Sequence, residues 1–267
     1  MSMYDRFNRQ IDYLRISVTD KCDLRCVYCM PEQGVPLIRH EDILSFEEIV
    51  EFTRHAVSCG ITKVRITGGE PLVRRGILTL VEMLGKIDGI RDFAMTTNGT
   101  RLAEFAQPLA AAGIRRVNIS LDTVDAGTYA RITRGGDIRN VLNGVTAAKT
   151  AGFWPIKINC VISLSPAEPD ARAVAEFAKH HGLEVRFIRR MNLQRGTFST
   201  VLGGNGGDCV HCNRIRLTCD GCVRPCLFSD TSFNVRQLGP REALRRAVEA
   251  KPESGQSSTA QFYSIGG

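Results

Sequence analysis

Residues 12–29 read Asp-Tyr-Leu-Arg-Ile-Ser-Val-Thr-Asp-Lys-Cys-Asp-Leu-Arg-Cys-Val-Tyr-Cys, a short apolar stretch followed at once by three cysteines. Tyr13–Ser17 has the composition of a strand, and Cys22, Cys26 and Cys29 come directly after it. In an α/β sheet the active site lies beyond the carboxyl ends of the strands. Because a [4Fe–4S] cluster takes four ligands, three thiolates leave one iron open to another molecule. The spacing therefore predicts a cluster with one open position.

A regular alternation of short apolar runs and helical segments continues to about residue 190. Helical segments end on Gly60, Gly113, Gly152 and Gly182, as expected of a residue that closes a helix. Ser45 and Glu48 form a capping box that opens a helix running through Cys59. The predicted strands are Tyr13–Ser17, Lys63–Thr67, Phe93–Thr97, Arg116–Ser120, Ile156–Ile162 and Glu184–Ile188. Six β/α units in series imply a parallel sheet, either flat or curved into a barrel.

The composition is that of a globular chain of 267 residues, with 43% hydrophobic and 24% charged residues. No apolar run approaches the roughly 20 residues that span a bilayer, and residues 1–15 lack the apolar core of a signal peptide. We therefore expect a cytoplasmic protein without a membrane partner. The net charge of +7 fits a solvated basic surface or a site for a polyanion. Nucleic acid is not favoured, because no basic stretch is interleaved with aromatic residues.

A second cysteine group lies near the end of the chain. The chain has ten cysteines, and five of them are Cys209, Cys212, Cys219, Cys222 and Cys226. In a reducing cytoplasm, clustered cysteines indicate metal ligands rather than disulfides. The isolated Cys59 and Cys160 are interpreted as buried small hydrophobic residues. We expect residues 1–191 to form the α/β unit and residues 192–267 a cysteine-rich extension, with a glycine-rich loop at 202–208 and a short helix at 240–250.

The first triplet, Cys-X3-Cys-X2-Cys with Tyr28 before its last cysteine, resembles the signature of the radical S-adenosylmethionine (SAM) enzymes. Thr67-Gly68-Gly69-Glu70-Pro71, at the end of the second predicted strand, is similar to the glycine motif of these enzymes. The resemblance implies that the open iron binds SAM and that its reductive cleavage yields a 5′-deoxyadenosyl radical. It also implies a partial (β/α)6 barrel. Physically, the glycines permit close backbone approach and Glu70 can pair with an ammonium group.

Within the radical SAM enzymes, the chain resembles the GTP 3′,8-cyclase (MoaA) family of molybdenum cofactor biosynthesis. The similar stretches are residues 12–31, 63–72, 96–99, 118–122 and 209–228, together with the terminal Ile-Gly-Gly. The resemblance implies that the radical takes hydrogen from the GTP ribose 3′ carbon and that the ribose radical attacks guanine C8. It implies two [4Fe–4S] clusters, and an electron donor such as flavodoxin or ferredoxin. A homodimer is possible.

The resemblance also assigns roles to individual residues. The SAM site would contain Tyr28, Gly69, Glu70, Ser120 and Met191. The GTP site would contain Arg15, Arg65, Thr96, Lys157, Arg214, Ile215 and Arg216. The first cluster would be held by Cys22, Cys26 and Cys29. The auxiliary cluster, whose free iron would bind guanine, would be held by Cys209, Cys212 and Cys226.

Two features depart from that family. Met191 and Cys209 are only 18 positions apart, several tens of residues closer than in the family, and Cys219 and Cys222 are additional cysteines. Thr218 and Asp220-Gly221 predict a hairpin turn that would hold these two cysteines away from the cluster. The alternative is a radical SAM enzyme that acts on a peptide or another substrate, with an auxiliary cluster fully ligated by cysteine. A zinc-binding interaction module would also use clustered cysteines, but it explains neither the first triplet nor the Gly-Gly-Glu motif.

Overall fold

The computed structural model describes residues 2–36 and 38–266, and all six predicted strands are present with ends within one residue of those expected. The strands are β1 (Tyr13–Ser17), β2 (Lys63–Thr67), β3 (Asp92–Thr97), β4 (Arg116–Ser120), β5 (Lys157–Ile162) and β6 (Glu184–Arg189). The helices that follow them are α1 (Phe46–Ser58), α2 (Ile77–Gly85), α3 (Leu102–Ala111), α4 (Ala126–Thr133), α5 (Ile138–Thr150) and α6 (Pro169–His181). Short 3-10 turns are η1 (His40–Asp42) and η2 (Pro71–Val73).

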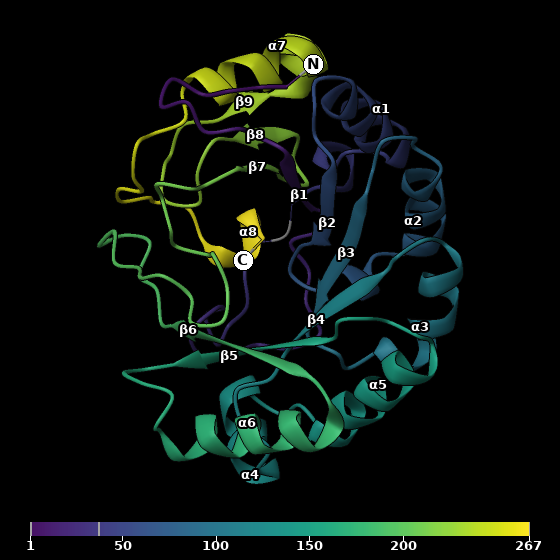
Figure 1. Ribbon diagram of the computed structural model, residues 1–267, viewed down its shortest axis with the longest axis vertical. Coiled ribbons are helices and arrows are strands. Elements are labelled where there is room, and N and C mark those ends of the chain that lie inside the picture. Colours follow the sequence, from purple (N-terminus) through teal and green to yellow (C-terminus); the bar gives the residue numbers. More distant parts are fainter. Residues whose placement is uncertain (1, 37, 267) are drawn as a thin grey trace.

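The six strands are parallel and lie in sequence order across one sheet. Figure 1 shows that the sheet curves, with the helices on its convex side, so the fold is a partial (β/α)6 barrel rather than a flat sheet. The main hydrophobic core lies between the sheet and these helices. It contains Leu14, Ile16, Val64 and Ile66, whose alternation along β1 and β2 leaves Arg15 and Arg65 on the opposite, inner face.

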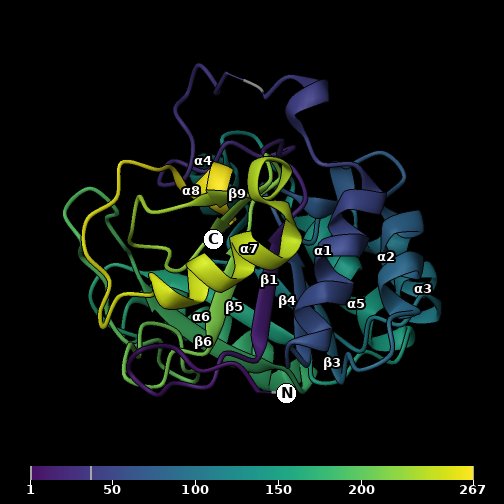
Figure 2. The same ribbon diagram turned by 90° about the horizontal axis from the view of Figure 1, so that it is seen from above.

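The C-terminal extension continues the same sheet. Strand β7 (Arg214–Leu217) pairs parallel with the free edge of β1, and β8 (Cys222–Arg224) and β9 (Phe233–Asn234) follow in antiparallel order. The expected division at residue 191 thus does not separate two sheets. Seen from above, α1, α2 and α3 lie on one side of β1, and α8 lies on the other (Figure 2).

The helix expected at 240–250 is the second part of α7 (Val235–Glu249). Gly239, with φ 75° and ψ 158°, interrupts the helix immediately before Pro240. The last element is the short α8 (Phe262–Ile265). No helix in the described part of the chain is long and apolar enough to cross a membrane.

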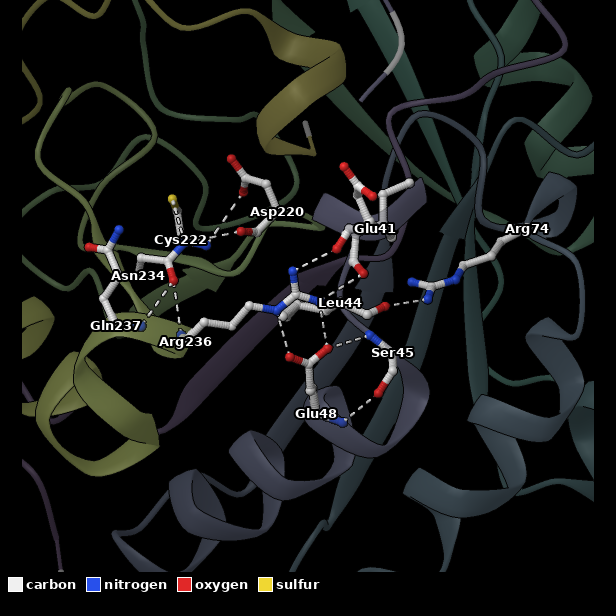
Figure 3. A network of polar contacts seen from close by, with 11 residues as sticks. Glu41, Leu44, Ser45, Glu48, Arg74, Asp220, Cys222, Asn234, Arg236 and Gln237 are labelled. Atoms are coloured by element: carbon white, nitrogen blue, oxygen red, sulfur yellow. Dashed lines mark hydrogen bonds and ion pairs between the residues drawn. The ribbon is translucent and has the colours of Figure 1, made fainter. Parts of the chain in front are cut away.

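Helices α1 and α7 are joined by Arg236. Its Nε donates to Glu48 Oε1 at 2.6 Å, and its two terminal nitrogens donate to the carbonyls of Glu41 and Ile43 (Figure 3). Glu48 also completes the predicted capping box with Ser45, so the box both starts α1 and positions the ion pair. Cys59 is the C-cap of α1 rather than its last residue. These contacts fix the C-terminal extension against the first β/α unit.

Candidate active site

The first three cysteines lie in the loop that follows β1. The Cys26 carbonyl accepts hydrogen bonds from the amides of Cys29 and Met30, and Cys22 Sγ accepts one from the Leu24 amide at 3.4 Å. Burial raises the pKa of Cys22 and Cys26 to about 12 and that of Cys29 to about 11, and each thiol is close enough to another to add to the shift. Iron must displace these protons on binding.

This thiol trio fits an iron–sulfur cluster better than a zinc ion. Within residues 2–36 and 38–266, no three Cys, His, Asp or Glu side chains converge closely enough to hold a single metal ion. A cluster is wider than an ion and needs only soft thiolate donors with hydrogen bonds to their sulfurs. The Leu24 amide supplies one such hydrogen bond to Cys22.

Gly68 and Gly69 pack the loop after β2 against the loop after β1. A Cβ on Gly69 would lie 2.3 Å from the Lys21 carbonyl oxygen, and one on Gly68 would lie 2.8 Å from the Thr19 carbonyl oxygen. The Gly69 amide donates to that Thr19 oxygen at 2.7 Å, and the Glu70 amide donates to the Lys21 oxygen at 2.8 Å. The glycines are therefore required by the backbone of the cysteine loop itself.

Glu70 is fully buried and its carboxylate is bonded to protein groups. Its oxygens accept hydrogen bonds from the Leu72 amide at 3.0 Å, the Thr97 hydroxyl at 2.8 Å and the Asn98 amide at 2.6 Å. Burial raises the pKa of Glu70 to about 7, against the opposing effect of these donors. This differs from the expected ion pair with an ammonium: the carboxylate ties the ends of β2 and β3 together behind the cysteine loop.

Tyr28 and Ser120 border a small cavity of about 30 Å³ beside Cys26. The Tyr28 hydroxyl donates to Asp122 Oδ2 at 2.6 Å, and Asp122 Oδ1 accepts from the Val161 amide at 2.8 Å. The cysteine loop is thus attached to the ends of β4 and β5. Sequence reasoning gave Asp122 no role of its own, although it is the last residue of the similar stretch 118–122.

A much larger cavity, of about 350 Å³, lies inside the barrel. Eight of its lining residues are Arg or Lys and two are Asp, so it is strongly basic. The predicted site residues that line it are Arg15, Arg65, Thr96, Met191, Arg214, Arg216, Cys209, Cys212 and Cys226. A basic cavity of this kind is suited to a polyanion.

Three arginines form a row across the floor of this cavity. Strand register places Arg15 of β1 directly between Arg65 of β2 and Arg216 of β7. Burial, together with the charge of Arg216, holds the pKa of Arg15 well below its usual value, and burial lowers that of Arg216 to about 10. Adjacent buried guanidinium groups repel one another, so an anion bound among them would be strongly stabilised.

Two of the predicted GTP residues do not line the cavity. Lys157 forms an ion pair with Glu184 of the neighbouring strand. Ile215 lies between Arg214 and Arg216, faces the opposite side of β7 and is fully buried in the main core.

Sequence reasoning missed Lys63 and Arg186, which do line the cavity. Lys63 lies two residues before Arg65, so the two-residue period of β2 was the signal that placed it on the inner face. Arg116 also lines the cavity, but it is bonded to Asp92 at 2.7 Å.

The second cysteine group divides into two sets. Cys209, Cys212 and Cys226 line the large cavity, whereas Cys219 and Cys222 do not. The predicted hairpin is present: the Gly221 amide donates to the Thr218 carbonyl and the Thr218 amide to the Cys222 carbonyl, both at 2.9 Å. Cys219 is fully buried in this turn. Three soft thiolates that line one cavity fit a second cluster with one open position.

The chain end returns to the carboxyl ends of β1 and β2. The Gly266 carbonyl accepts a hydrogen bond from Arg216 Nη1 at 2.6 Å. A Cβ on Gly266 would lie 2.9 Å from Thr67 Cγ2 and 3.0 Å from Ser17 Cβ. Gly267, the last residue of the expected diglycine tail, lies outside the described residues.

Comparison with known proteins identifies the family. The sequence pattern of the Radical SAM superfamily matches residues 16–178. The chain belongs to the radical SAM superfamily. The GTP 3′,8-cyclase of Geobacter sulfurreducens is 39% identical over 95% of this chain and 94% of its own length. That of Moorella thermoacetica is 38% identical over 99% of this chain and 100% of its own length. Within the superfamily, this radical SAM enzyme is thus a member of the GTP 3′,8-cyclase family.

The solved structures share the fold. SuiB of Streptococcus suis bound to S-adenosylmethionine superimposes with a TM-score of 0.65 at 15% identity, over 92% of this chain and 66% of SuiB. The enzyme anSMEcpe with bound AdoMet gives 0.63 at 15% identity, over 87% of this chain and 77% of anSMEcpe. The alignment with the Moorella thermoacetica cyclase covers 325 positions against 267 residues here. This difference agrees with the short interval between Met191 and Cys209.

Proposed function

We propose that this radical SAM enzyme converts GTP to (8S)-3′,8-cyclo-7,8-dihydroguanosine 5′-triphosphate, in molybdenum cofactor biosynthesis. The observation that carries the proposal is the Arg216–Arg15–Arg65 row inside a basic cavity that also contains Cys209, Cys212 and Cys226. The negative charge of a triphosphate complements these guanidinium groups. Membership of the GTP 3′,8-cyclase family supports the same substrate.

On the SAM side, Cys22, Cys26 and Cys29 would hold the first [4Fe–4S] cluster, and Tyr28, Gly69, Ser120 and Met191 would surround bound SAM. When bound, this cluster supplies the electron for reductive cleavage of SAM. Glu70 would act indirectly, because its hydrogen bonds fix the Gly-Gly loop against the cysteine loop. The loops after β1 to β4 would thus orient SAM toward the interior of the barrel.

On the GTP side, Cys209, Cys212 and Cys226 would hold a second cluster whose open position takes the guanine. Arg15, Arg65, Arg214 and Arg216 would bind the triphosphate, with Lys63 and Arg186 beside them. Thr96 accepts a hydrogen bond from Arg65 at 3.2 Å and would help to orient that guanidinium. The position of Cys219 and Cys222 away from the cavity supports an open position over the peptide-substrate alternative, which would need a fourth thiolate.

The reaction also implies partners. Reductive cleavage of SAM needs an external electron donor, for which flavodoxin or ferredoxin is suited. Clustered free thiols fit the reducing cytoplasm. A homodimer stays a prediction from the resemblance.

The test is anaerobic incubation of the reconstituted protein with SAM, a reductant and GTP, followed by mass spectrometry of the nucleotides. We expect the cyclic triphosphate together with 5′-deoxyadenosine. Cys26→Ala is the control and should form neither, while its C-terminal cluster stays in place. SAM cleavage by the parent protein without any change in GTP would refute the proposal.

A further inference from the structure

Lys251 follows the last turn of α7 and is one of the largest fully buried side chains, with 2% exposure. Its Nζ donates to the Arg214 carbonyl at 2.7 Å and to the Pro225 carbonyl at 2.8 Å. These two carbonyls belong to the segments that carry Cys212 and Cys226. One ammonium group therefore joins the two separate stretches of chain that supply cysteines to the second site.

The third cysteine segment is attached to the same turn. Arg9 donates from Nη1 to the Cys209 carbonyl at 2.7 Å and to the Glu253 carbonyl at 2.8 Å, and from Nη2 to the Pro252 carbonyl at 2.6 Å. Residues 251–253 thus connect all three cysteine segments through two buried cations. A hydrophobic core could not provide such directional contacts to loop carbonyls.

The two cations differ in how their charge is balanced. Arg9 is paired with Asp5, with Nε and Oδ2 2.6 Å apart. Lys251 forms no ion pair with a carboxylate among the residues that the structure describes. A buried ammonium without an anionic partner is costly. Lys251 lines the same cavity as Cys212 and Cys226, and its charge acts on both of these sulfurs.

We propose that Lys251 is a positioning residue of the second iron–sulfur cluster, which holds the Cys212 and Cys226 segments together and raises the reduction potential of the cluster. The inference rests on the proposed second cluster. Reduction adds negative charge to a cluster, and a buried ammonium beside two of its thiolates stabilises that charge. The first cysteine triplet instead lies near the carboxylates of Asp23 and Asp122.

The test isolates the second cluster by replacing Cys22, Cys26 and Cys29 with Ala. In this background, iron per chain and the midpoint potential are measured by electron paramagnetic resonance during redox titration. The variants are Lys251→Met, which keeps the length without the charge, and Lys251→Arg, which keeps the charge. Lys179→Met is the matched control, because Lys179 is exposed on α6.

The parent here is the triple-Ala protein with Lys251 intact. At its midpoint potential, Lys251→Met should lower the ratio of reduced to oxidised cluster about tenfold, which corresponds to a midpoint potential about 59 mV lower for one electron. Lys251→Arg should recover most of this shift, and Lys179→Met should behave like the parent. A Lys251→Met protein with the parent's iron content and potential would overturn the inference.

Two further outcomes are equally decisive. If Lys251→Met binds no iron, recovery of iron by Lys251→Arg supports the inference, and equal loss in both variants refutes a role for the charge. If the triple-Ala background itself binds no iron, the second cluster and the proposed function fail with it. That result is distinguishable from a background that binds iron but does not respond to Lys251→Met.

Discussion

Arg15 and Arg216 lie directly opposite one another on the paired strands β1 and β7, although 200 residues separate them in the chain. Both guanidinium groups face the interior cavity, and burial lowers the pKa of each. The pairing of these two strands brings the segments that carry the two cysteine groups together. The same pair creates the positive floor on which we place the triphosphate.

Arg65→Ala should weaken GTP binding by roughly one to two orders of magnitude. Charge-assisted contacts to a phosphate contribute about 1.5–3 kcal/mol each. Arg65 is buried and its Nε donates to the Tyr13 hydroxyl, so its orientation is fixed before GTP binds. Anaerobic calorimetry with GTP measures the effect, and SAM binding should be nearly unchanged. Arg139→Ala, which removes an exposed arginine paired with Asp137, is the matched control. Equal GTP affinity in Arg65→Ala and the parent would remove the triphosphate assignment.

Gly69→Ala should disrupt the first cluster. The new Cβ would meet the Lys21 carbonyl oxygen at 2.3 Å, and because that neighbour is backbone, the cysteine loop must move. Such overpacking costs about 1–3 kcal/mol. We expect a severalfold loss of iron from the first site and of 5′-deoxyadenosine formation. Gly127→Ala is the control, since the nearest atom to its Cβ would be Asp125 Oδ1 at 3.5 Å. Normal SAM cleavage by Gly69→Ala would contradict this prediction, because it would show that the first cluster does not depend on close packing of Gly69 against the cysteine loop.

Much of the barrel was predictable from the sequence, because each strand is a short apolar run and each helix closes on a glycine or begins with a cap. The pairing of β7 with β1 was not, because a parallel contact over 200 residues leaves no local pattern. The position of a lysine within an apolar strand also did not show whether its side chain belongs to the site. Lys157 and Lys63 both lie in apolar strands and both are paired with a carboxylate, that of Glu184 and that of Asp12, yet only Lys63 lines the cavity. Which face a strand residue occupies depends on register, and register is fixed only by the assembled sheet.

Asp92→Asn should lower stability in a pH-dependent way. Burial raises the pKa of Asp92, but the hydrogen bonds and charge of Arg116 outweigh it and hold the pKa below its ordinary value of 3.8. Because the folded-state pKa is the lower one, the pair stabilises the protein above about pH 4 and this contribution is lost as the pH falls through the folded value. We expect Asp92→Asn to reduce the free energy of unfolding by roughly 0.5–1 kcal/mol at pH 7. Chemical denaturation of variant and parent at each pH should show the difference shrinking below pH 4, and a difference independent of pH would contradict the assignment.

Cys219→Ser and Cys222→Ser should leave the second cluster unchanged. Both side chains belong to the β7–β8 hairpin, and neither lines the cavity that contains Cys209, Cys212 and Cys226. The electron paramagnetic resonance signal of the reduced second cluster should therefore be the same in both variants, and it should change when GTP is added to either. A signal that ignores GTP but responds to one of the serine substitutions would mean that a fourth thiolate occupies the open position.

The hydrogen atom that leaves the substrate provides the most direct test of the proposed cyclase. GTP carrying deuterium at the ribose 3′ carbon is incubated anaerobically with the reconstituted protein, SAM and reductant, and the 5′-deoxyadenosine is analysed by mass spectrometry. If GTP lies in the basic cavity with its ribose toward SAM, the deuterium should appear in 5′-deoxyadenosine and the GTP should be converted to its cyclic product. Formation of 5′-deoxyadenosine without deuterium, with the labelled GTP recovered intact, would contradict the proposed reaction.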